Sequence, residues 1–382
     1  MVARIGVLIG SQESEVRSQN SGVRRQESGV IWEVERKLKE AMLYQKQQDG
    51  RVFCQLCPHY CLIEEGKRGI CQVRENRGGL LYSLVFGRTV TQNVDRVEKK
   101  PLFHFYPGSN SYSLATAGCN FHCQYCTNWQ VSQMSAEQFA EFGVEASPEK
   151  IVTDALKTGC RSIAYTYVEP TIFFEYVYEI ASLAHSHGLF NLFKTNGFMT
   201  MEMLKICHSF LNAANVDLKA FRDKTYRQFG GRLQPVLDSL KFMKALGIWL
   251  EITTVIIPGV NDENQEIEDI AGFIAQELGV DTPWHITRFF PAYKMENIPP
   301  TPLEMLYKAR KIGLEKGLRY VYFGNLLGEG NQDTICPNCG KLLIQRRGCE
   351  LVENLMQSDQ CPSCGILIPG VGLSHQISED LT

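Results

Sequence analysis

Cysteine spacing is the feature that most constrains how this chain can fold. Eleven of its 14 cysteines form three groups, within residues 54–71, 119–126 and 336–364, and the last range also contains the ungrouped Cys349. At 382 residues with 44% hydrophobic residues, the chain is large enough to form a core without a disulfide scaffold. Grouped cysteines in such a chain are typical of metal thiolates in a reducing compartment. The first residues also lack a secretory pattern, and we therefore expect a cytoplasmic metal-binding protein.

The charge balance argues against two classes of partner. Lys and Arg number 39 and Asp and Glu number 42, which gives a formal net charge of −3 at pH 7. A chain so near neutrality has no basic excess that would attract nucleic acid or an anionic membrane. No apolar stretch approaches the roughly 18 residues that a membrane-spanning helix needs. We expect neither nucleic acid nor a membrane as a partner.

Composition divides the chain into five predicted segments. Residues 11–30 hold a seven-residue repeat with one apolar residue in each copy, which is too few for a coiled-coil seam and predicts a disordered tail. Four-residue apolar spacing then predicts a helix from Ile31 to about Gln47. The predicted segments are a tail at 1–30, an N-terminal helix and four-cysteine module at 31–109, a barrel at 110–328, a zinc-ribbon-like module at 329–372 and a tail at 373–382.

Short apolar runs alternate with amphipathic helical patterns between about residues 110 and 325. The runs are 112–116, 162–167, 190–195, 214–218, 249–257, 284–288 and 320–323. The helical patterns are 148–157, 171–187, 201–210, 234–246, 264–278 and 302–316. This alternation predicts an α/β fold with a parallel sheet covered by helices. A closed or partly open β/α barrel fits best, and its active-site residues are expected at the C-terminal ends of the strands.

Three cysteines just after the first predicted strand form the central motif. Cys119, Cys123 and Cys126 are separated by three and then two residues. Four thiolates usually complete an iron–sulfur cluster, so three would leave one iron atom open to a substrate, as catalytic zinc sites keep an open position. The alternative is a zinc knuckle completed by His122 or by a distant cysteine.

With Tyr125 directly before its third cysteine, this motif resembles the signature of the radical S-adenosylmethionine (SAM) superfamily. The resemblance covers about residues 110–325 and implies a partial (β/α)6 barrel. It implies that the three thiolates ligate a [4Fe–4S] cluster whose open iron binds SAM. One-electron reduction would then cleave SAM to methionine and a 5′-deoxyadenosyl radical that abstracts hydrogen. That first step needs no side-chain acid or base.

Motifs at later strand ends extend the resemblance. Glu169-Pro170 matches the end of a Gly-Gly-Glu-Pro-like stretch facing the SAM amino group, but the glycines are replaced here. Asp217-x-Lys219 is similar to a motif of glycyl-radical activating enzymes, and an acid and a base together suit a zwitterionic methionine moiety. Taken singly, such a pair is more often a surface pair, and a lone His is more often structural. The implied SAM contacts are Tyr125, Glu169, Thr195, Asn196, Asp217, Lys219, Ile257 and His285.

The C-terminal cysteines form two Cys-Pro-x-Cys-Gly knuckles separated by 21 residues. This spacing is the standard signature of a zinc ribbon, in which four thiolates hold one structural zinc ion. The predicted ligands are Cys336, Cys339, Cys361 and Cys364. Residues 342–344 and 351–355 are then expected to be strands of the ribbon, and Cys349 is not needed as a ligand.

The N-terminal cysteines have a less specific spacing of two, three and nine residues. Four thiolates can hold either zinc or an auxiliary iron–sulfur cluster, and four reduced, buried thiols are the alternative. The four residues are Cys54, Cys57, Cys61 and Cys71. Downstream of them, the charged run at 98–100 either faces the barrel and its substrate or forms solvated surface.

The order of the three cysteine groups narrows the resemblance to the radical SAM proteins of the AmmeMemoRadiSam system, which are similar to pyruvate formate-lyase activating enzymes. It covers residues 50–372 and implies a radical SAM enzyme with an unidentified substrate. A flavodoxin- or ferredoxin-like reductant protein and a protein substrate are the implied partners. One alternative is a glycyl-radical activase. Another is a docking or redox-sensing protein with reduced catalysis, which the replaced glycines before Glu169 favour.

Overall fold

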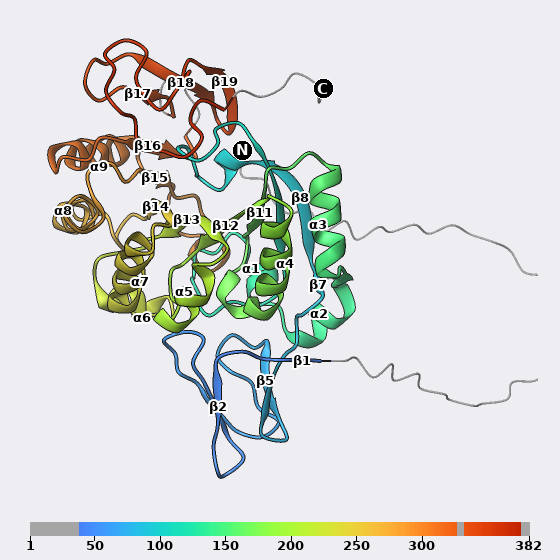
Figure 1. Cartoon of the computed structure of the whole chain (residues 1–382). Coiled ribbons are helices and arrows are strands. Elements are labelled where there is room, and N and C mark those ends of the chain that lie inside the picture. The colour runs from blue at the N-terminus through green and yellow to red at the C-terminus, as the bar shows by residue number, and fades with distance from the viewer. Residues whose placement is uncertain (1–37, 327–331, 376–382) are drawn as a thin grey trace, which may run out of the picture.

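The computed structural model describes residues 38–326 and 332–375. The predicted tail at 1–30, the start of the predicted N-terminal helix and the end of the predicted C-terminal tail lie outside these residues. A β/α body forms the middle of the molecule (Figure 1). The N-terminal cysteine module lies at one end of this body and the C-terminal cysteine module at the other.

One eight-stranded sheet carries the β/α body, in the order β16-β15-β14-β13-β12-β11-β9-β8. Seven strands are parallel, and β8 pairs antiparallel with β9. The strands are β8 (Thr91–Arg96), β9 (Asn110–Ala115), β11 (Ser162–Tyr165), β12 (Phe190–Thr195), β13 (Leu211–Asp217), β14 (Trp249–Ile256), β15 (Trp284–Arg288) and β16 (Val321–Gly324). Each predicted apolar run overlaps one parallel strand, which confirms the α/β fold class. The sheet is open, with β8 and β16 as its edges.

Helices cover the outer side of this sheet and connect its strands (Figure 1). The α-helices are α1 (Trp129–Ser132), α2 (Ala136–Phe142), α3 (Pro148–Lys157), α4 (Phe174–Ser186), α5 (Met201–Cys207), α6 (Asp223–Gln228), α7 (Leu233–Ala245), α8 (Asn264–Phe273) and α9 (Leu303–Glu315). Three short 3-10 helices are described, η1 (Val97–Lys99), η2 (Pro170–Phe173) and η4 (Tyr293–Met295). A π-helical turn, η3 (Ile274–Leu278), follows α8. Six strand–helix units lead from β9 to β16, as a partial barrel requires.

Two small antiparallel sheets form the N-terminal module, in the orders β1-β6-β5 and β2-β3-β4. Their strands are β1 (Lys39–Glu40), β2 (Tyr44–Lys46), β3 (Val52–Cys54), β4 (Leu62–Ile63), β5 (Arg74–Arg77) and β6 (Leu80–Ser83). Beyond them, β7 (Arg88–Thr89) pairs with β10 (Val144–Glu145) and joins the module to the body.

The helix predicted from Ile31 to about Gln47 is wrong over its described part, where the chain forms β1 and β2. Tertiary hydrogen bonds hold the bend between these two strands. The Met42 N–H donates to the Glu175 carboxylate at 2.7 Å, and the Met42 carbonyl accepts from Arg74 at 2.6 Å. Partners distant in sequence therefore override the four-residue apolar spacing, which expresses only a local preference.

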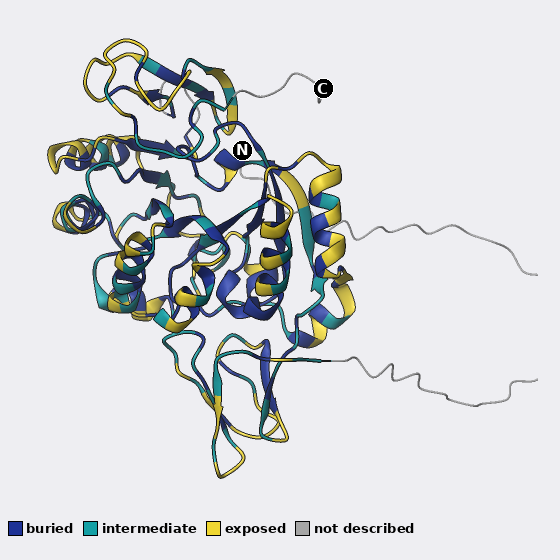
Figure 2. Cartoon of the chain, viewed as in Figure 1, coloured by how far each residue is buried: buried dark blue, intermediate teal, exposed yellow. Residues whose placement is uncertain are grey.

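The C-terminal module is a three-stranded antiparallel sheet of β17 (Thr334–Ile335), β18 (Leu342–Arg347) and β19 (Glu350–Asn354). The predicted ribbon strands at 342–344 and 351–355 are thus present. Arg346 of β18 is buried and donates to the Phe103 carbonyl at 2.6 Å. The module therefore packs on the body as part of the folded core, and its buried face is visible in Figure 2.

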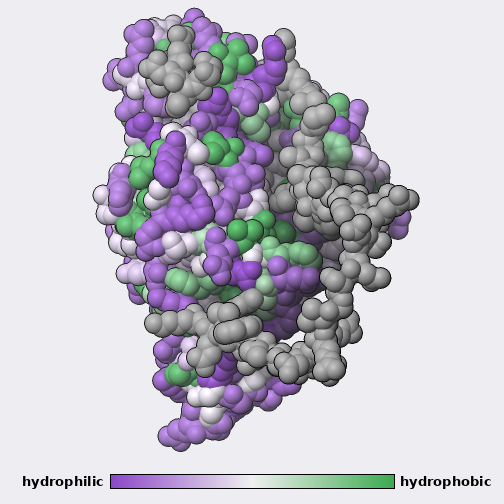
Figure 3. Space-filling view, turned by 90° about the vertical axis from the view of Figure 1, so that its right-hand side faces the viewer, coloured by the Kyte–Doolittle hydropathy of each residue, from purple (hydrophilic) through white to green (hydrophobic). Residues whose placement is uncertain are grey.

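Figure 3 shows one side of the molecule, on which hydrophilic and hydrophobic residues are interspersed. Within residues 38–326 and 332–375, no helix has the length and apolar character needed to cross a membrane.

Candidate functional site

A cavity of about 480 Å³ lies at the C-terminal ends of the parallel strands, where a β/α barrel carries its active site. Most of the predicted site residues line it. They are Cys119, Cys123, Tyr125, Cys126, Glu169, Thr195, Asn196, Asp217, Lys219 and His285. Ile257 does not line the cavity. It packs with Phe229 and Phe289 in an apolar cluster beside Tyr125, and Val255 lines the wall instead.

The three-cysteine loop follows β9 and lies along this cavity. The Phe121 N–H donates to the Cys119 sulfur at 3.4 Å, and the Cys126 sulfur lies 3.3 Å from the Ser132 hydroxyl. Such donors suit a thiolate that ligates a metal. His122, in contrast, is exposed and bonds through Nδ1 to the Gln133 side chain at 2.6 Å. That contact gives no support to His122 as the fourth ligand of a zinc knuckle.

Glu169 is the centre of a hydrogen-bond network that joins the ends of β11 and β12. Its Oε1 accepts from the hydroxyls of Thr171 and Thr195, each at 2.7 Å. Its Oε2 accepts from the backbone N–H of Asn196 at 2.7 Å. Burial raises the pKa of this carboxyl although its hydrogen bonds oppose the shift. A carboxylate has about four lone-pair sites, so Oε2 retains accepting capacity toward the cavity.

Asn196 links the same network to the cysteine loop. Its side-chain N–H donates to the Asn120 side-chain oxygen at 2.8 Å, and Asn120 in turn donates to the Phe198 carbonyl at 3.1 Å. Asn120 lies directly after Cys119, so the ends of β9, β11 and β12 are connected by hydrogen bonds. Asn120 is not among the site residues predicted from the sequence.

Asp217 lies between two lysines and is not a solvated surface residue. Lys219 donates to its Oδ2 at 3.0 Å, and Lys194 donates to its Oδ1. Burial opposes ionisation, but the two ammonium groups lower the pKa of Asp217 to about 2. Lys194 was missed by the sequence analysis. Its signal is in the strand register, because Lys194 pairs with Asn215, two residues from Asp217 and on the same sheet face.

Tyr125 and His285 have different surroundings at the cavity. The Lys219 ammonium lies 5.6 Å from the centre of the Tyr125 ring, which packs edge-on against Phe229. His285 is buried, and its Nε2 lies 2.7 Å from the Glu251 carboxylate. This contact indicates a structural role for His285, and its ring also borders the cavity.

The charged run at 98–100 borders the cavity and is largely buried. Lys100 is 1% exposed and donates to Asp95 at 2.6 Å, and Glu98 is 2% exposed and pairs with Arg346. Only Lys99 of this run is exposed. The interpretation as solvated surface is therefore wrong for Glu98 and Lys100.

Tyr167 occupies one of the two positions where the family pattern has glycine. It has a φ of +65°, a conformation that bulky residues rarely adopt. Its hydroxyl donates to Asp95 at 2.5 Å, and the Lys100 ammonium lies 4.9 Å from its ring centre. The left-handed turn before Glu169 is thus retained without glycine.

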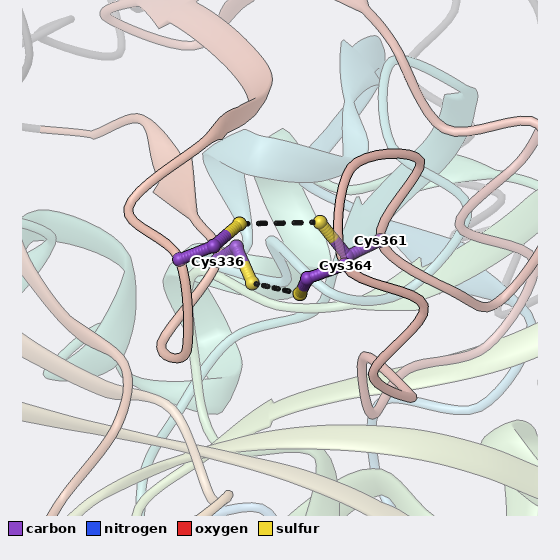
Figure 4. Close-up of side chains that lie close together, drawn as sticks. Cys336, Cys361 and Cys364 are labelled. Atoms are coloured by element: carbon purple, nitrogen blue, oxygen red, sulfur yellow. Dashed lines mark hydrogen bonds between the residues drawn. The ribbon is translucent and has the colours of Figure 1, made fainter.

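The four C-terminal cysteines converge on one point (Figure 4). The Cys336 and Cys364 sulfurs are 3.6 Å apart, and those of Cys339 and Cys361 are 3.7 Å apart. Four thiolates around one zinc ion at 2.3 Å would be separated by about 3.8 Å. Among the described residues this is the set of metal-ligating side chains whose donor atoms all lie within 4.8 Å of one another. The arrangement fits a single tetrahedral metal ion.

The N-terminal cysteines and the three-cysteine loop have wider spacing than this. In neither group do three sulfur atoms lie within 4.8 Å of one another. An iron–sulfur cluster binds each thiolate through a different iron atom, so its ligands are further apart than those of one ion. Cys160 and Cys207 are buried core thiols, and the Cys349 side chain lies at the cavity rim.

Comparison with known proteins identifies relatives that cover between about half and most of the chain. Residues 113–274 match the family model described as the radical SAM superfamily. An uncharacterised protein of Methanocaldococcus jannaschii is 42% identical over 330 residues, which cover 86% of this chain and 98% of the relative. A second protein of that organism, provisionally named a glycyl-radical enzyme activating enzyme, is 26% identical over 212 residues, 54% of this chain and 78% of the relative. A domain of pyruvate-formate lyase-activating enzyme from Bacteroides vulgatus superposes with a TM-score of 0.38 at 18% identity, covering 43% of this chain and 99% of that structure.

Proposed function

The chain belongs to the radical SAM superfamily, and from that premise we propose that Cys119, Cys123 and Cys126 of the three-cysteine loop bind its [4Fe–4S] cluster. The single observation that carries this proposal is that the three thiols line one cavity together with the polar ends of the parallel strands. When bound, the cluster supplies the electron that cleaves SAM to methionine and a 5′-deoxyadenosyl radical.

Within this cavity, Glu169, Asp217 and Lys219 are the proposed partners of the methionine moiety of SAM. Glu169 Oε2 offers an acceptor to the SAM amino group, and its other hydrogen bonds keep the carboxylate in place. Two lysines beside one aspartate leave an excess positive charge that suits the SAM carboxylate. These groups bind and orient SAM, and the hydrogen bond from Thr195 to Glu169 preserves that orientation.

The adenine end of SAM is proposed to pack near Tyr125 and Val255. Tyr125 is partly buried against Phe229 and offers an apolar surface on the cavity wall. Val255 replaces the predicted Ile257 in this role, because Val255 belongs to β14 and lines the cavity, whereas Ile257 follows the end of the strand and packs with Phe229 and Phe289. His285 borders the cavity, and its contact with Glu251 holds it in place.

Formation of 5′-deoxyadenosine tests the proposal. The full chain is reconstituted anaerobically with iron and sulfide, reduced with dithionite and incubated with SAM, and the product is measured by chromatography. We expect product from the wild type and none from Cys123→Ala. Cys207→Ala is the matched control, because Cys207 is a fully buried thiol outside all three groups. Equal product from wild type and Cys123→Ala would overturn the assignment. No product from a wild type that contains the cluster would favour the docking or redox-sensing alternative.

A protein substrate is the second part of the proposal. The observation that favours it is the similarity to a relative named as a glycyl-radical enzyme activating enzyme, together with the Asp217-x-Lys219 motif. A flavodoxin- or ferredoxin-like protein is the proposed electron donor. Hydrogen transfer from a deuterated protein fraction into 5′-deoxyadenosine, measured by mass spectrometry, would distinguish a protein substrate from a small molecule.

A further inference from the structure

The four N-terminal cysteines lie close together without converging on one point. The Cys54 N–H donates to the Cys61 carbonyl at 2.9 Å, so these two residues face each other across β3 and β4. The Tyr60 N–H, directly before Cys61, donates to the Cys57 carbonyl at 3.1 Å. A Cβ added at Gly69 would lie 3.6 Å from the Cys61 sulfur, and the Gly69 carbonyl accepts the N–H of Gln72, the residue after Cys71, at 2.9 Å. Backbone contacts therefore bring the four cysteines together. Their sulfurs nevertheless remain wider apart than the C-terminal set.

A buried cation accompanies this group. Arg74 of β5 is 1% exposed and pairs with Glu175 of α4 at 3.0 Å. The Arg74 carbonyl accepts the N–H of Gly69 at 3.0 Å, which places the residue beside Cys61 and three residues after Cys71. Its Nε and Nη1 are buried and have no hydrogen-bond partner. Unsatisfied donors on a buried charge are costly, so their position beside four thiols points to acceptors that thiolate sulfurs would supply.

We propose that Cys54, Cys57, Cys61 and Cys71 hold a second [4Fe–4S] cluster, and that Arg74 is a positioning residue whose free N–H groups bond to its thiolates. Two observations favour this cluster over a zinc ion. The sulfur spacing is wider than that of the C-terminal group, since neither here nor in the three-cysteine loop do three sulfur atoms lie within 4.8 Å of one another. A cluster with four thiolates carries net negative charge, which the buried guanidinium offsets.

The proposed second cluster adjoins the loop of the first. A Cβ added at Gly118, directly before Cys119, would lie 2.8 Å from the Cys71 carbonyl oxygen. In a second contact, His59 Nε2 lies 2.7 Å from the Asn120 carbonyl oxygen. Cys57, Cys61, Cys71, Cys119 and Cys123 also pack against the same apolar core. The two cysteine groups are therefore parts of one continuous structure.

Metal content of the full chain tests the proposal independently of SAM cleavage. Iron, sulfide and zinc are measured after anaerobic reconstitution of the wild type and of two variants. One variant is Cys119→Ala/Cys123→Ala/Cys126→Ala, and the other is Cys57→Ala/Cys61→Ala. The control is Cys160→Ala/Cys207→Ala, which removes two buried thiols outside the groups. Circular dichroism of each variant reports whether it is folded.

We expect about eight iron atoms in the wild type and control, and about four in each variant. The triple variant should still show the electron paramagnetic resonance signal of a reduced cluster, although it cannot cleave SAM. About four iron atoms and two zinc ions in the wild type would overturn the proposal in favour of zinc. A folded triple variant with neither metal in the N-terminal group would overturn it in favour of free thiols. If the triple variant fails to fold, the wild-type iron content still decides.

The role of Arg74 is tested by measuring the reduction potential of the cluster that remains in the Cys119→Ala/Cys123→Ala/Cys126→Ala variant. Arg74→Gln/Glu175→Gln removes both charges of the buried pair and leaves no unpaired ion. We expect the reduction potential of the remaining cluster to become more negative, because a cation and N–H donors near the sulfurs favour the reduced state. An unchanged potential with full iron content would show that Arg74 supports only the fold.

Discussion

Glu169 accepts the backbone N–H of Asn196 at 2.7 Å, and this hydrogen bond joins the ends of β11 and β12 at the cavity. The Asn196 side chain continues the connection to Asn120, which follows the first cysteine of the central motif. A carboxylate proposed to bind SAM is thereby coupled to the loop proposed to hold the cluster. A change at Glu169 should accordingly affect both SAM binding and the stability of the site.

Glu169→Gln should weaken the site without changing its size. The amide NH2 group cannot accept the Asn196 N–H, so one buried donor loses its partner, at a cost of about 1–3 kcal/mol in the free energy of unfolding. SAM affinity, measured by equilibrium dialysis of the reconstituted protein, should fall by about tenfold or more. Glu179→Gln on α4, whose side chain is partly exposed, is the control and should change neither quantity. Wild-type affinity in Glu169→Gln would remove Glu169 from the proposed contacts.

Lys100 should make the stability of the protein depend on pH in the alkaline range. Burial lowers its pKa to about 8 despite Asp95 at 2.6 Å, whereas the unfolded chain keeps the proton up to about pH 10.4. Between these values the unfolded state binds more protons, so the free energy of unfolding rises with pH. Relative to Lys100→Met, the wild type should gain about 1–2 kcal/mol between pH 8 and pH 10 in denaturant titrations. Parallel curves for the two proteins would contradict a lowered pKa.

The C-terminal module should contain one structural zinc ion. Cys339→Ser removes one of four converging thiols and should lower zinc from about one ion per chain to near zero, while iron content stays unchanged. Cys349→Ser changes a cysteine of the same module that is not in the converging set, and it should retain the zinc. Elemental analysis of the purified proteins measures both metals. Equal zinc loss in the two variants would argue against the four-thiolate assignment.

Gly118→Ala should loosen the contact between the N-terminal module and the β/α body. Gly118 has a φ of +87°, and an added Cβ would lie 2.8 Å from both the Cys71 carbonyl and the Val73 side chain. Gly50→Ala is the matched control, because Gly50 has a φ of +81° but no atom near the position of the added Cβ. Both variants carry a left-handed penalty of about 1–2 kcal/mol, so the excess loss in Gly118→Ala isolates the contact. Equal destabilisation in urea unfolding would show that the module can shift at no cost.

Local patterns predicted the β/α body well because the signals are contained within single elements. The run at 190–195 forms β12 with the same bounds, and the pattern at 148–157 forms α3 with its Ser147 cap. The cysteine spacings are similarly local, and the C-terminal ligand set appears as converging sulfurs. Where the pattern and the long-range contacts agreed, the sequence was sufficient.

Contacts between residues that are distant in the chain could not be predicted from local sequence patterns. The residues near Lys194 in the chain do not indicate that it pairs with Asp217, because this contact depends on the register of β12 against β13. Arg346 pairs with Glu98 from the far end of the chain, and this contact buries a run that otherwise reads as surface. Met42 lies in the bend between β1 and β2, where Glu175 and Arg74 hold its backbone.

The sequence by itself determined which strands and helices form in the β/α body and which C-terminal cysteines converge, because periodicity, caps and ligand spacing act within a few residues. Only the tertiary structure decided which charges meet at the cavity, how far apart the thiols of each group lie, and that the N-terminal module contacts the three-cysteine loop. Those properties depend on strand register and on burial, and both arise when segments distant in sequence pack against one another.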